Sequence, residues 1–378
     1  MKICQFCSTN FEGLYYASLA RALMADGHEM LYVTLQEQRV PAWMQTLPGV
    51  RHLSLNIPSR WQYPLAALKL AWWLRRENVT VLQTHLFDAG LIGMLAARLA
   101  GVPLRLVARH HLDEVQLLGT RWHVMLDQWM ARQADGVIVP SQAVRRYMAE
   151  AESLSAENIE VIPPGFDFAT LTADEDDRQR VRAEFGLSGA FVLGCVGRLF
   201  KNKGHIYLFQ ALHSLLAEMP DARILLVGDG DRGPIEEMLA ELGLQDRVVF
   251  AGYRRDIAAC MKALDVMVHP SLSESFGQVL VEAMAVGTPV IATTVGGVPE
   301  IVSHLDTGLL APPRDADALA RAIRQLYFDP QLRRQLAAAG QQSVWRRFTA
   351  EKLMQDYVEF YRRYERARSS NGKSYVRA

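Results

Sequence analysis

The sequence of 378 residues predicts an α/β protein made of two doubly wound domains. Three observations favour this fold class. Short apolar or β-branched runs alternate with segments of helical periodicity, which is typical of a parallel sheet covered by helices on both faces. The length fits two domains of about 150 residues or somewhat more. Pro163, Pro164 and Gly165 interrupt the alternation once, and the same pattern then begins again.

The first series of elements covers residues 1–165. Several of its predicted helices end at a glycine, such as Gly27 or Gly101, as helices commonly do. The expected strands are 2–6, 30–35, 50–55, 79–84, 104–108, 136–139 and 159–162, and the expected helices are 13–24, 65–76, 89–99, 122–133 and 142–149.

The second series covers residues 166–349, and its acidic, polar stretch 172–180 is interpreted as the linker between the domains. Beyond it we expect an amphipathic helix at about 350–368 and a disordered tail at 369–378. The expected strands are 191–196, 224–227, 248–250, 266–268 and 290–292, and the expected helices are 206–217, 235–242, 257–264, 276–286 and 316–327. Ligands of such sheets bind beyond the carboxyl ends of the strands, so the site should lie in the loops that follow strands.

Composition and charge exclude several classes of protein. Half of the residues are hydrophobic, 22% are charged and the net charge is zero, so nothing favours a nucleic-acid partner. No apolar run reaches the roughly 18 residues of a membrane span. Met1 leads directly into a strand-like run instead of a signal peptide, so we expect a cytoplasmic protein.

Four cysteines in a chain of this length do not form a disulfide framework. Cys4 and Cys7 make a CxxC motif, but they lie in and just after a predicted strand. Redox pairs place the reactive thiol at a helix N-terminus. We therefore interpret both cysteines as small buried side chains, with redox or metal chemistry as the alternative.

The segment HPSLSESFGQVLVEAMAVGTPVIATTVGG at 269–297 contains a strand end, a polar loop, a helix and a further strand. Glu274 lies in the loop before the helix, whose N-terminus offers free N–H groups to an anion or hydroxyl. Glu282 lies inside the helix among apolar neighbours. A carboxylate can accept two hydrogen bonds side by side, which suits a vicinal diol such as a ribose. The alternative is that Glu274 only caps the helix and Glu282 is exposed.

The loop GRLFKNKG at 197–204 follows a predicted strand and precedes a helix. Arg198 and Lys203 on a glycine-containing loop suit a diphosphate, and the alternative is a solvated basic loop. A formal GxGxxG motif follows at 228–233. The next strand does not end in the carboxylate that the dinucleotide fingerprint needs, so an NAD enzyme is a poor second choice.

The stretch ESFGQVLVEAMAVGTPVIATTVGGVPE contains two glutamates separated by seven residues. It resembles the nucleotide-sugar site of retaining glycosyltransferases with the GT-B fold, of the family 4 type (glycosyl transferases group 1). The resemblance covers about residues 1–361. It implies two Rossmann-like domains that face each other across a cleft, of which 1–165 binds the acceptor and 166–349 binds the nucleotide sugar. It also implies that the C-terminal helix crosses back to the first domain.

The resemblance further implies roles for single residues. Arg198 and Lys203 would hold the donor diphosphate, and Glu274 would hold hydroxyls of the donor sugar. His85, at the end of a predicted strand, would approach the donor sugar or the acceptor. His110 and His111 follow the predicted strand 104–108. Of these two, His111 fits the family's register better. The other implied donor-binding residues are Gly13, His111, Gly197, Gly228, Tyr253, Arg254, Phe276, Gly277 and Glu282.

One departure concerns the first loop between a strand and a helix. Many family members carry two glycines there, whereas this chain has Glu12 followed by Gly13. The backbone has to approach the diphosphate closely at this loop. We expect Glu12 to point at the acceptor, because a carboxylate would repel the diphosphate.

The reaction that the resemblance implies needs neither a cofactor nor a metal. A sugar moves from a nucleotide diphosphate to an acceptor hydroxyl with retention at the anomeric carbon, and the leaving phosphate takes the acceptor proton. The acceptor would be a glycan or a lipid-linked sugar in polysaccharide, lipopolysaccharide or glycolipid synthesis. Two alternatives remain open: a GT-B epimerase or phosphorylase, and a non-catalytic binder of sugar nucleotides.

The stretch 60–76 predicts a contact with the inner leaflet of a membrane, which would make the protein peripheral. Tryptophan and arginine together suit a lipid headgroup region. The residues concerned are Arg60, Trp61, Lys69, Trp72, Trp73, Arg75 and Arg76. The alternative is ordinary packing, in which Leu65, Leu68 and Trp72 lie against the sheet.

Overall fold

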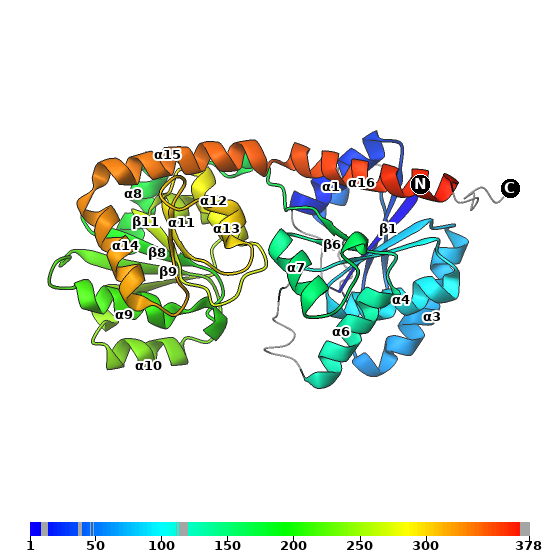
Figure 1. Cartoon of the computed structure of the whole chain (residues 1–378), viewed down its shortest axis with the longest axis horizontal. Helices are drawn as coiled ribbons and strands as arrows, with labels where there is room; N and C mark the ends of the chain where they lie inside the picture. Colours follow the sequence, from blue (N-terminus) through cyan, green and yellow to red (C-terminus); the bar gives the residue numbers. More distant parts are fainter. Residues whose placement is uncertain are drawn as a thin grey trace. The chain divides into compact units, whose positions relative to one another are not determined.

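The computed structural model describes residues 1–8, 14–36, 40–45, 47, 49–110, 112 and 120–370. The chain forms two compact units, which are Met1–Phe166 together with Ala350–Ala378 (unit 1), and Asp167–Thr349 (unit 2) (Figure 1). Each unit has one parallel sheet. The predicted α/β class is therefore confirmed.

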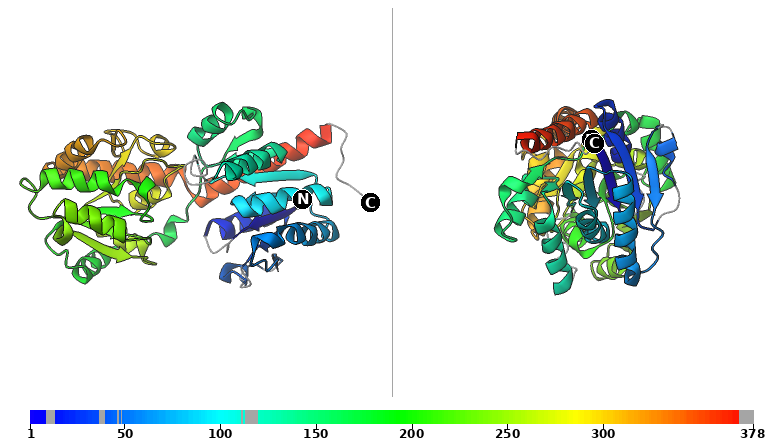
Figure 2. Two further views of the ribbon diagram at one scale, coloured as in Figure 1. Left: turned by 90° about the horizontal axis from the view of Figure 1, so that it is seen from below. Right: turned by 90° about the vertical axis from the view of Figure 1, so that its right-hand side faces the viewer.

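Unit 1 has a seven-stranded sheet in the order β3-β2-β1-β4-β5-β6-β7, with helices on both faces (Figure 2). Alternate side chains of β1 point to opposite faces of the sheet. Phe6 packs with α3 and α4, whereas Ile3 packs with α1 and α16. The strands are β1 (Lys2–Cys7), β2 (Glu29–Thr34), β3 (Arg51–Ser54), β4 (Val81–His85), β5 (Leu104–Ala108), β6 (Gly136–Val139) and β7 (Ile159–Val161). The helices are α1 (Leu14–Ala25), α2 (Ala42–Gln45), η1 (Arg60–Gln62), α3 (Tyr63–Arg76), α4 (Phe87–Ala100), α6 (Arg121–Gln133), α7 (Gln142–Glu150), η2 (Ala156–Asn158) and α16 (Ala350–Ser370).

Unit 2 has a six-stranded sheet in the order β10-β9-β8-β11-β12-β13. Its strands are β8 (Phe191–Val196), β9 (Ala222–Val227), β10 (Val248–Gly252), β11 (Val266–His269), β12 (Val290–Thr293) and β13 (Leu309–Ala311). Its helices are η3 (Phe168–Thr170), α8 (Glu175–Glu184), η4 (Lys201–Lys203), α9 (His205–Leu215), α10 (Gly233–Glu241), η5 (Gln245–Arg247), α11 (Ile257–Lys262), α12 (Gln278–Ala285), α13 (Val298–Ile301), α14 (Ala316–Phe328) and α15 (Pro330–Arg347).

The prediction that 172–180 is a linker is wrong, because most of this stretch belongs to helix α8 of unit 2. Asp174 caps the helix by accepting from the N–H of Asp177. Arg178 and Arg182 then bind opposite oxygens of Asp265, at 2.7 and 2.6 Å, so the charged side chains anchor the helix to its own unit.

The C-terminal helix α16 packs on unit 1 through buried apolar residues that include Leu353 and Phe360. It continues to Ser370, two residues into the predicted disordered tail. The rest of that tail, 371–378, lies outside the described residues.

Cys4 and Cys7 are buried in β1, and neither forms a disulfide with a described residue. Cys4 belongs to the cluster on one face of the sheet and Cys7 to the cluster on the other. Burial raises the pKa of the Cys4 thiol. Both cysteines therefore pack as small apolar groups, as the sequence predicts.

Candidate functional site

Three loops of unit 2 lie in contact at the carboxyl end of its sheet. The N–H of Gly197 donates to Val227 O, and the N–H of Gly228 donates to Gly252 O, both at 2.9 Å. Gly228 has a φ of 147°, and a Cβ there would lie 1.9 Å from Gly197 O. Only glycine allows this approach at position 228. Gly197 takes part through its backbone oxygen, and its φ of 145° is a conformation that favours glycine although a Cβ there would meet open space.

A second close contact joins η4 to the loop after β11. A Cβ on Gly204 would lie 2.1 Å from Pro270 O, and Gly204 has a φ of 67°. The N–H of Leu272 donates to Asn202 O at 2.7 Å. These backbone contacts bring Lys203 and Glu274 together, although 71 positions separate them in the sequence.

Glu274 receives two partners on a single oxygen. Lys203 Nζ lies 2.7 Å from Glu274 Oε2, and Nε2 of the buried His269 lies 3.1 Å from the same atom. Burial alone would raise the pKa of Glu274, but the hydrogen bonds and charges of His269 and Lys203 outweigh it and lower the pKa to about 2. Glu274 is therefore ionised at neutral pH, and its partners leave Oε1 as the oxygen for another ligand.

The N-terminus of α12 follows Glu274 directly. Gly277 adopts a φ of 106° there, so the helix begins one residue later, at Gln278. The Phe276 side chain is buried and meets the Phe348 ring edge-on at 5.3 Å. Within the described residues, no hydrogen bond occupies the N–H groups of Phe276 and Gly277. Donor groups of this kind suit an oxygen of a bound ligand.

Glu282 lies within α12, partly buried between Val281 and Ala283. Burial raises the pKa of its carboxyl group to about 7. In the part of the chain that the structure describes, no hydrogen bond or ion pair compensates this carboxylate. A half-buried carboxylate of this kind gains most from a ligand that donates hydrogen bonds.

Arg198 is exposed, and its guanidinium lies 4.5 Å above the Phe200 ring. Tyr253 is also exposed, at 74%. Arg254 is held differently, because Asp256 and Glu184 both bind its guanidinium. The Arg254 side chain is therefore already engaged, and the predicted contact of this residue with the donor would be made by its backbone.

In unit 1, His85 ends β4 and is completely buried. Its Nε2 lies 2.6 Å from Gln5 Oε1, and its Nδ1 lies 3.1 Å from His110 Nε2. A carbonyl oxygen only accepts, so the short contact with Gln5 Oε1 favours a hydrogen on Nε2 of His85, with Nδ1 accepting from His110. The amide Nε2 of Gln83, which can only donate, lies farther from the same atom, at 3.4 Å. Burial, aided by His110, holds the pKa of His85 well below its usual value. His85 is thus a neutral link between Gln5 and the exposed ring of His110.

Two predicted site residues, Gly13 and His111, lie outside the described residues. Two other residues were not predicted to take part. No role is predicted for His269, which stands at the end of a strand, or for Gln5, which lies inside one. The only sequence signal for either was a polar side chain inside an apolar strand, where side chains are expected to be buried and paired.

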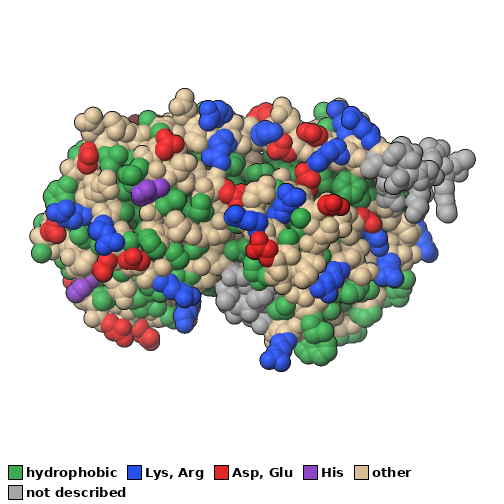
Figure 3. Space-filling model, in the orientation of Figure 1, with side chains coloured by type: hydrophobic (Ala, Val, Ile, Leu, Met, Phe, Trp, Pro, Cys, Tyr) green, Lys and Arg blue, Asp and Glu red, His purple; other side chains and the backbone are tan. Residues whose placement is uncertain are grey.

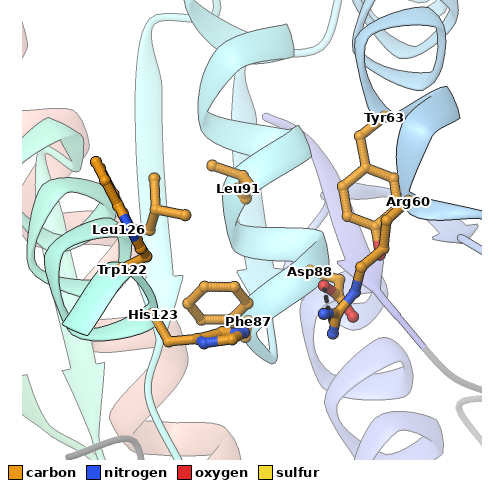
Figure 4. Close-up of a pocket in the computed structure, with 8 residues that line it drawn as sticks. All are labelled: Arg60, Tyr63, Phe87, Asp88, Leu91, Trp122, His123 and Leu126. Atoms are coloured by element: carbon orange, nitrogen blue, oxygen red, sulfur yellow. Dashed lines mark ion pairs between the residues drawn. The ribbon is translucent and has the colours of Figure 1, made fainter. Parts of the chain in front are cut away.

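A pocket of about 230 Å³ opens beside α4 and α6 of unit 1 (Figure 4). Phe87 and His123 lie close together in it, with ring centroids 5.3 Å apart. Arg60 reaches across to Asp88 at 3.7 Å. The full lining is Arg60, Tyr63, Phe87, Asp88, Leu91, Trp122, His123 and Leu126. Mostly apolar walls with one ion pair suit an amphipathic ligand.

The two halves of the chain match two descriptions of one enzyme class. Residues 177–343 match "Glycosyl transferases group 1", and residues 13–170 match "Glycosyltransferase Family 4". Over 372 residues, the chain is 30% identical to N-acetyl-alpha-D-glucosaminyl L-malate synthase of Bacillus anthracis, and this alignment covers 94% of each protein. The chain belongs to the group 1, family 4 type glycosyltransferases. The predicted family is therefore confirmed, and the protein is a glycosyltransferase.

Another relative of this glycosyltransferase is the 2-deoxystreptamine glucosyltransferase of Streptomyces kanamyceticus. It is 34% identical over 271 residues, which are 68% of this chain and 70% of the relative. Its name and that of the malate synthase describe different acceptors. These relatives therefore differ from each other in the molecule that receives the sugar.

Solved structures support the same fold. Anabaena HepE in complex with UDP and glucose has a TM-score of 0.82 and 26% identity, and the match covers 96% of this chain and 99% of HepE. Sucrose-phosphate synthase of Thermosynechococcus elongatus has a TM-score of 0.82 and 26% identity, with 97% and 100% coverage. The predicted GT-B fold of the glycosyltransferase is confirmed. None of the helices that the structure describes is long and apolar enough to cross a membrane.

Proposed function

We propose that this glycosyltransferase moves a sugar from a nucleotide-diphosphate donor to an acceptor hydroxyl with retention of anomeric configuration. The observation that carries the proposal is the arrangement of Lys203, Glu274 and Glu282 along one pair of loops and the helix behind them. HepE, which binds UDP and glucose, supports a nucleotide-sugar donor. Arg198 and Lys203 hold the diphosphate and neutralise the charge that grows on it as the bond to the sugar breaks.

Glu274 holds the donor sugar and does not attack it. A carboxylate with a pKa of about 2 that already binds Lys203 and His269 is a weak base and a weak nucleophile. Its Oε1 and the N–H groups of Phe276 and Gly277 instead bind sugar hydroxyls. This leaves the departing phosphate to take the acceptor proton on the same face, and retention follows from attack on that face.

The same cations make a metal unnecessary. Arg198 and Lys203 supply fixed positive charge where a divalent cation would otherwise stabilise the leaving diphosphate. The reaction is therefore proposed to need no metal and no cofactor. His85 acts as a positioning residue, because its ring is buried and its Nδ1 lies against His110, whose ring is exposed.

The acceptor is proposed to be a glycan or a lipid-linked sugar of polysaccharide, lipopolysaccharide or glycolipid synthesis. A lipid-linked acceptor stays in its bilayer, so the enzyme would have to work at the inner leaflet, on the cytoplasmic side. Incubation with a nucleotide sugar, with and without added acceptor, tests the reaction class. An epimerase or phosphorylase would convert the donor without a glycosyl acceptor.

Glu282→Ala should weaken donor binding by roughly 1.5–3 kcal/mol, because the ribose diol loses a charged acceptor of two hydrogen bonds. Isothermal titration calorimetry with the nucleoside diphosphate measures the loss. Gln278→Ala is the matched control, because this exposed residue lies on the same helix. Unchanged affinity in Glu282→Ala would rule out the ribose assignment.

Donor affinity should also depend on pH through Glu282. Its pKa of about 7 in the free protein means that protonation competes with the diol below neutrality. The ionised form binds, so affinity for a nucleotide-diphosphate sugar should fall by up to about tenfold per pH unit below 7 and level off above it. A titration series over pH checks this. The profile of Glu282→Gln should be flat, and an equally steep profile in that variant would contradict the assignment.

A further inference from the structure

Three neighbouring helices of unit 1 expose an unusual number of large apolar side chains. Helix α4 contacts both α3 and α6, and the three follow one another in Figure 1. We call the surface that they form with η1 the α3–α6 face. Its large apolar residues are between 40% and 76% exposed, and they are Trp61, Leu65, Leu68, Trp72, Leu95, Leu99, Trp122 and Met125. Together they present on the order of several hundred Å², the range in which patches mark interaction sites.

Helix α3 shows that this exposure is built into the sequence. Leu65, Leu68 and Trp72 share one helix face by their spacing of three and four residues, and that face points to solvent. The opposite face packs on the sheet with Ala66, Ala67, Leu70, Ala71 and Leu74. The alternative, in which Leu65, Leu68 and Trp72 pack on the sheet, is therefore wrong. Of the residues named for the membrane contact, Trp73 does not share the exposed face, because it packs against the core.

The same face concentrates positive charge. Residues 60–76, 87–100 and 121–133 contain seven Lys and Arg but only two Asp, although the whole chain has no net charge. Asp127 is buried against Arg109, so it contributes no charge to the surface. Asp88 pairs with Arg60. Blue and green side chains adjoin in Figure 3 over the surface where Figure 1 places α3 and α6.

The cations lie beside the apolar groups and not apart from them. The Arg76 guanidinium stacks on the Trp72 ring at 5.3 Å. Arg75 donates to the carbonyls of Leu99 and Ala100, which places its charge in the seam between α3 and α4. Such mixed side chains allow the rings to enter a headgroup region while the cations meet lipid phosphates.

We propose that the α3–α6 face docks onto an anionic lipid bilayer. A row of tryptophan and leucine flanked by arginine matches a surface that is negative outside and apolar beneath. A second copy of this chain fits less well, because two such faces would bring like charges together. This proposal depends on the proposed function in one respect, which is that a lipid-linked acceptor requires the enzyme to work at the bilayer.

The pocket beside α4 and α6 connects the α3–α6 face with the end of strand β4. Trp122 lines the pocket and also belongs to the α3–α6 face, and Phe87 lines it two residues after the end of β4. The docked face would therefore extend from the bilayer to the carboxyl edge of the unit 1 sheet. An acceptor whose lipid remains in the membrane could then reach that edge.

Vesicle flotation with the full chain tests the proposal. Wild-type protein should float with phosphatidylcholine vesicles that contain phosphatidylglycerol, at low salt, and bind pure phosphatidylcholine much less. Leu65→Gln/Leu68→Gln/Trp72→Gln should weaken binding on the order of a hundredfold, because three apolar groups no longer enter the interface. Arg76→Gln/Arg121→Gln should weaken it about 25-fold, at roughly fivefold for each cation. Phe328→Gln is the control, as an exposed apolar residue of unit 2.

Two results would overturn the proposal. One is the absence of wild-type flotation with anionic vesicles at low salt, and the other is flotation that the triple variant does not change. If sedimentation instead shows a dimer that the triple variant dissociates, the face binds a second copy and not lipid. Thermal shift by UDP, GDP and ADP is measured in parallel. Loss of flotation with a normal nucleotide shift separates the surface from the proposed function, whereas the absence of a shift with all three nucleotides in the wild type counts against the function alone.

Discussion

Replacing Lys203 or Arg198 by alanine should lower kcat by roughly a hundredfold or more. Both cations act on charge that develops on the diphosphate in the transition state, where a fixed donor contributes most. Lys203 is also preorganised, since Glu274 Oε2 holds its Nζ at 2.7 Å. Steady-state kinetics with a saturating donor measures the effect.

Lys201→Ala provides the matched control, because Lys201 is an exposed cation of the same short helix. It should retain nearly full turnover. EDTA should change the wild-type rate little. Activity that disappears with EDTA and returns with manganese or magnesium would contradict the assignment of charge stabilisation to these two residues.

The second large effect is expected for Glu274→Gln. The amide keeps the shape of the side chain but loses the charge that holds Lys203 and His269 on one oxygen. We expect kcat to fall by roughly a hundredfold, because both the sugar contacts and the position of Lys203 are disturbed. Affinity for the free nucleoside diphosphate should fall less than kcat, since this ligand makes no sugar contact and is affected only through the position of Lys203.

His269→Ala tests the same arrangement from the other side. His269 reaches Glu274 but is itself buried, so it acts as a positioning residue. Its loss should lower kcat less than the loss of Glu274 and leave the nucleotide affinity unchanged. A covalent glycosyl adduct on Glu274, seen by mass spectrometry, would contradict the view that Glu274 only holds the sugar.

The alternation of strands and helices was predictable because parallel strands buried on both faces leave continuous apolar runs. The segment around Glu274 was predictable for a different reason, since its loop and helix carry their own motif. Helix α8 was missed because its surface is acidic. Its stability comes from pairs between Arg178 or Arg182 and the distant Asp265, which no local pattern reveals.

The orientation of α3 illustrates a second limit. Its inward face is made of alanine and leucine, and its outward face of leucine and tryptophan. Periodicity identifies a helix but does not decide which apolar face turns to the core when both faces are apolar. The role of His269 was hidden for another reason. Its partner Glu274 is only five residues away, but the position of that carboxylate is set by Lys203, which comes from a loop far away in the sequence.

Thermal-shift screening of the wild-type protein against UDP, GDP and ADP and their sugars tests the central claim most directly, namely that unit 2 binds a nucleotide-diphosphate sugar through Lys203, Glu274 and Glu282. One base should stabilise the protein by about 2.7 kcal/mol at 100 times its dissociation constant. The same ligand should stabilise Glu282→Ala clearly less. The absence of stabilisation by all three nucleotides, or equal stabilisation of the variant, would contradict the account.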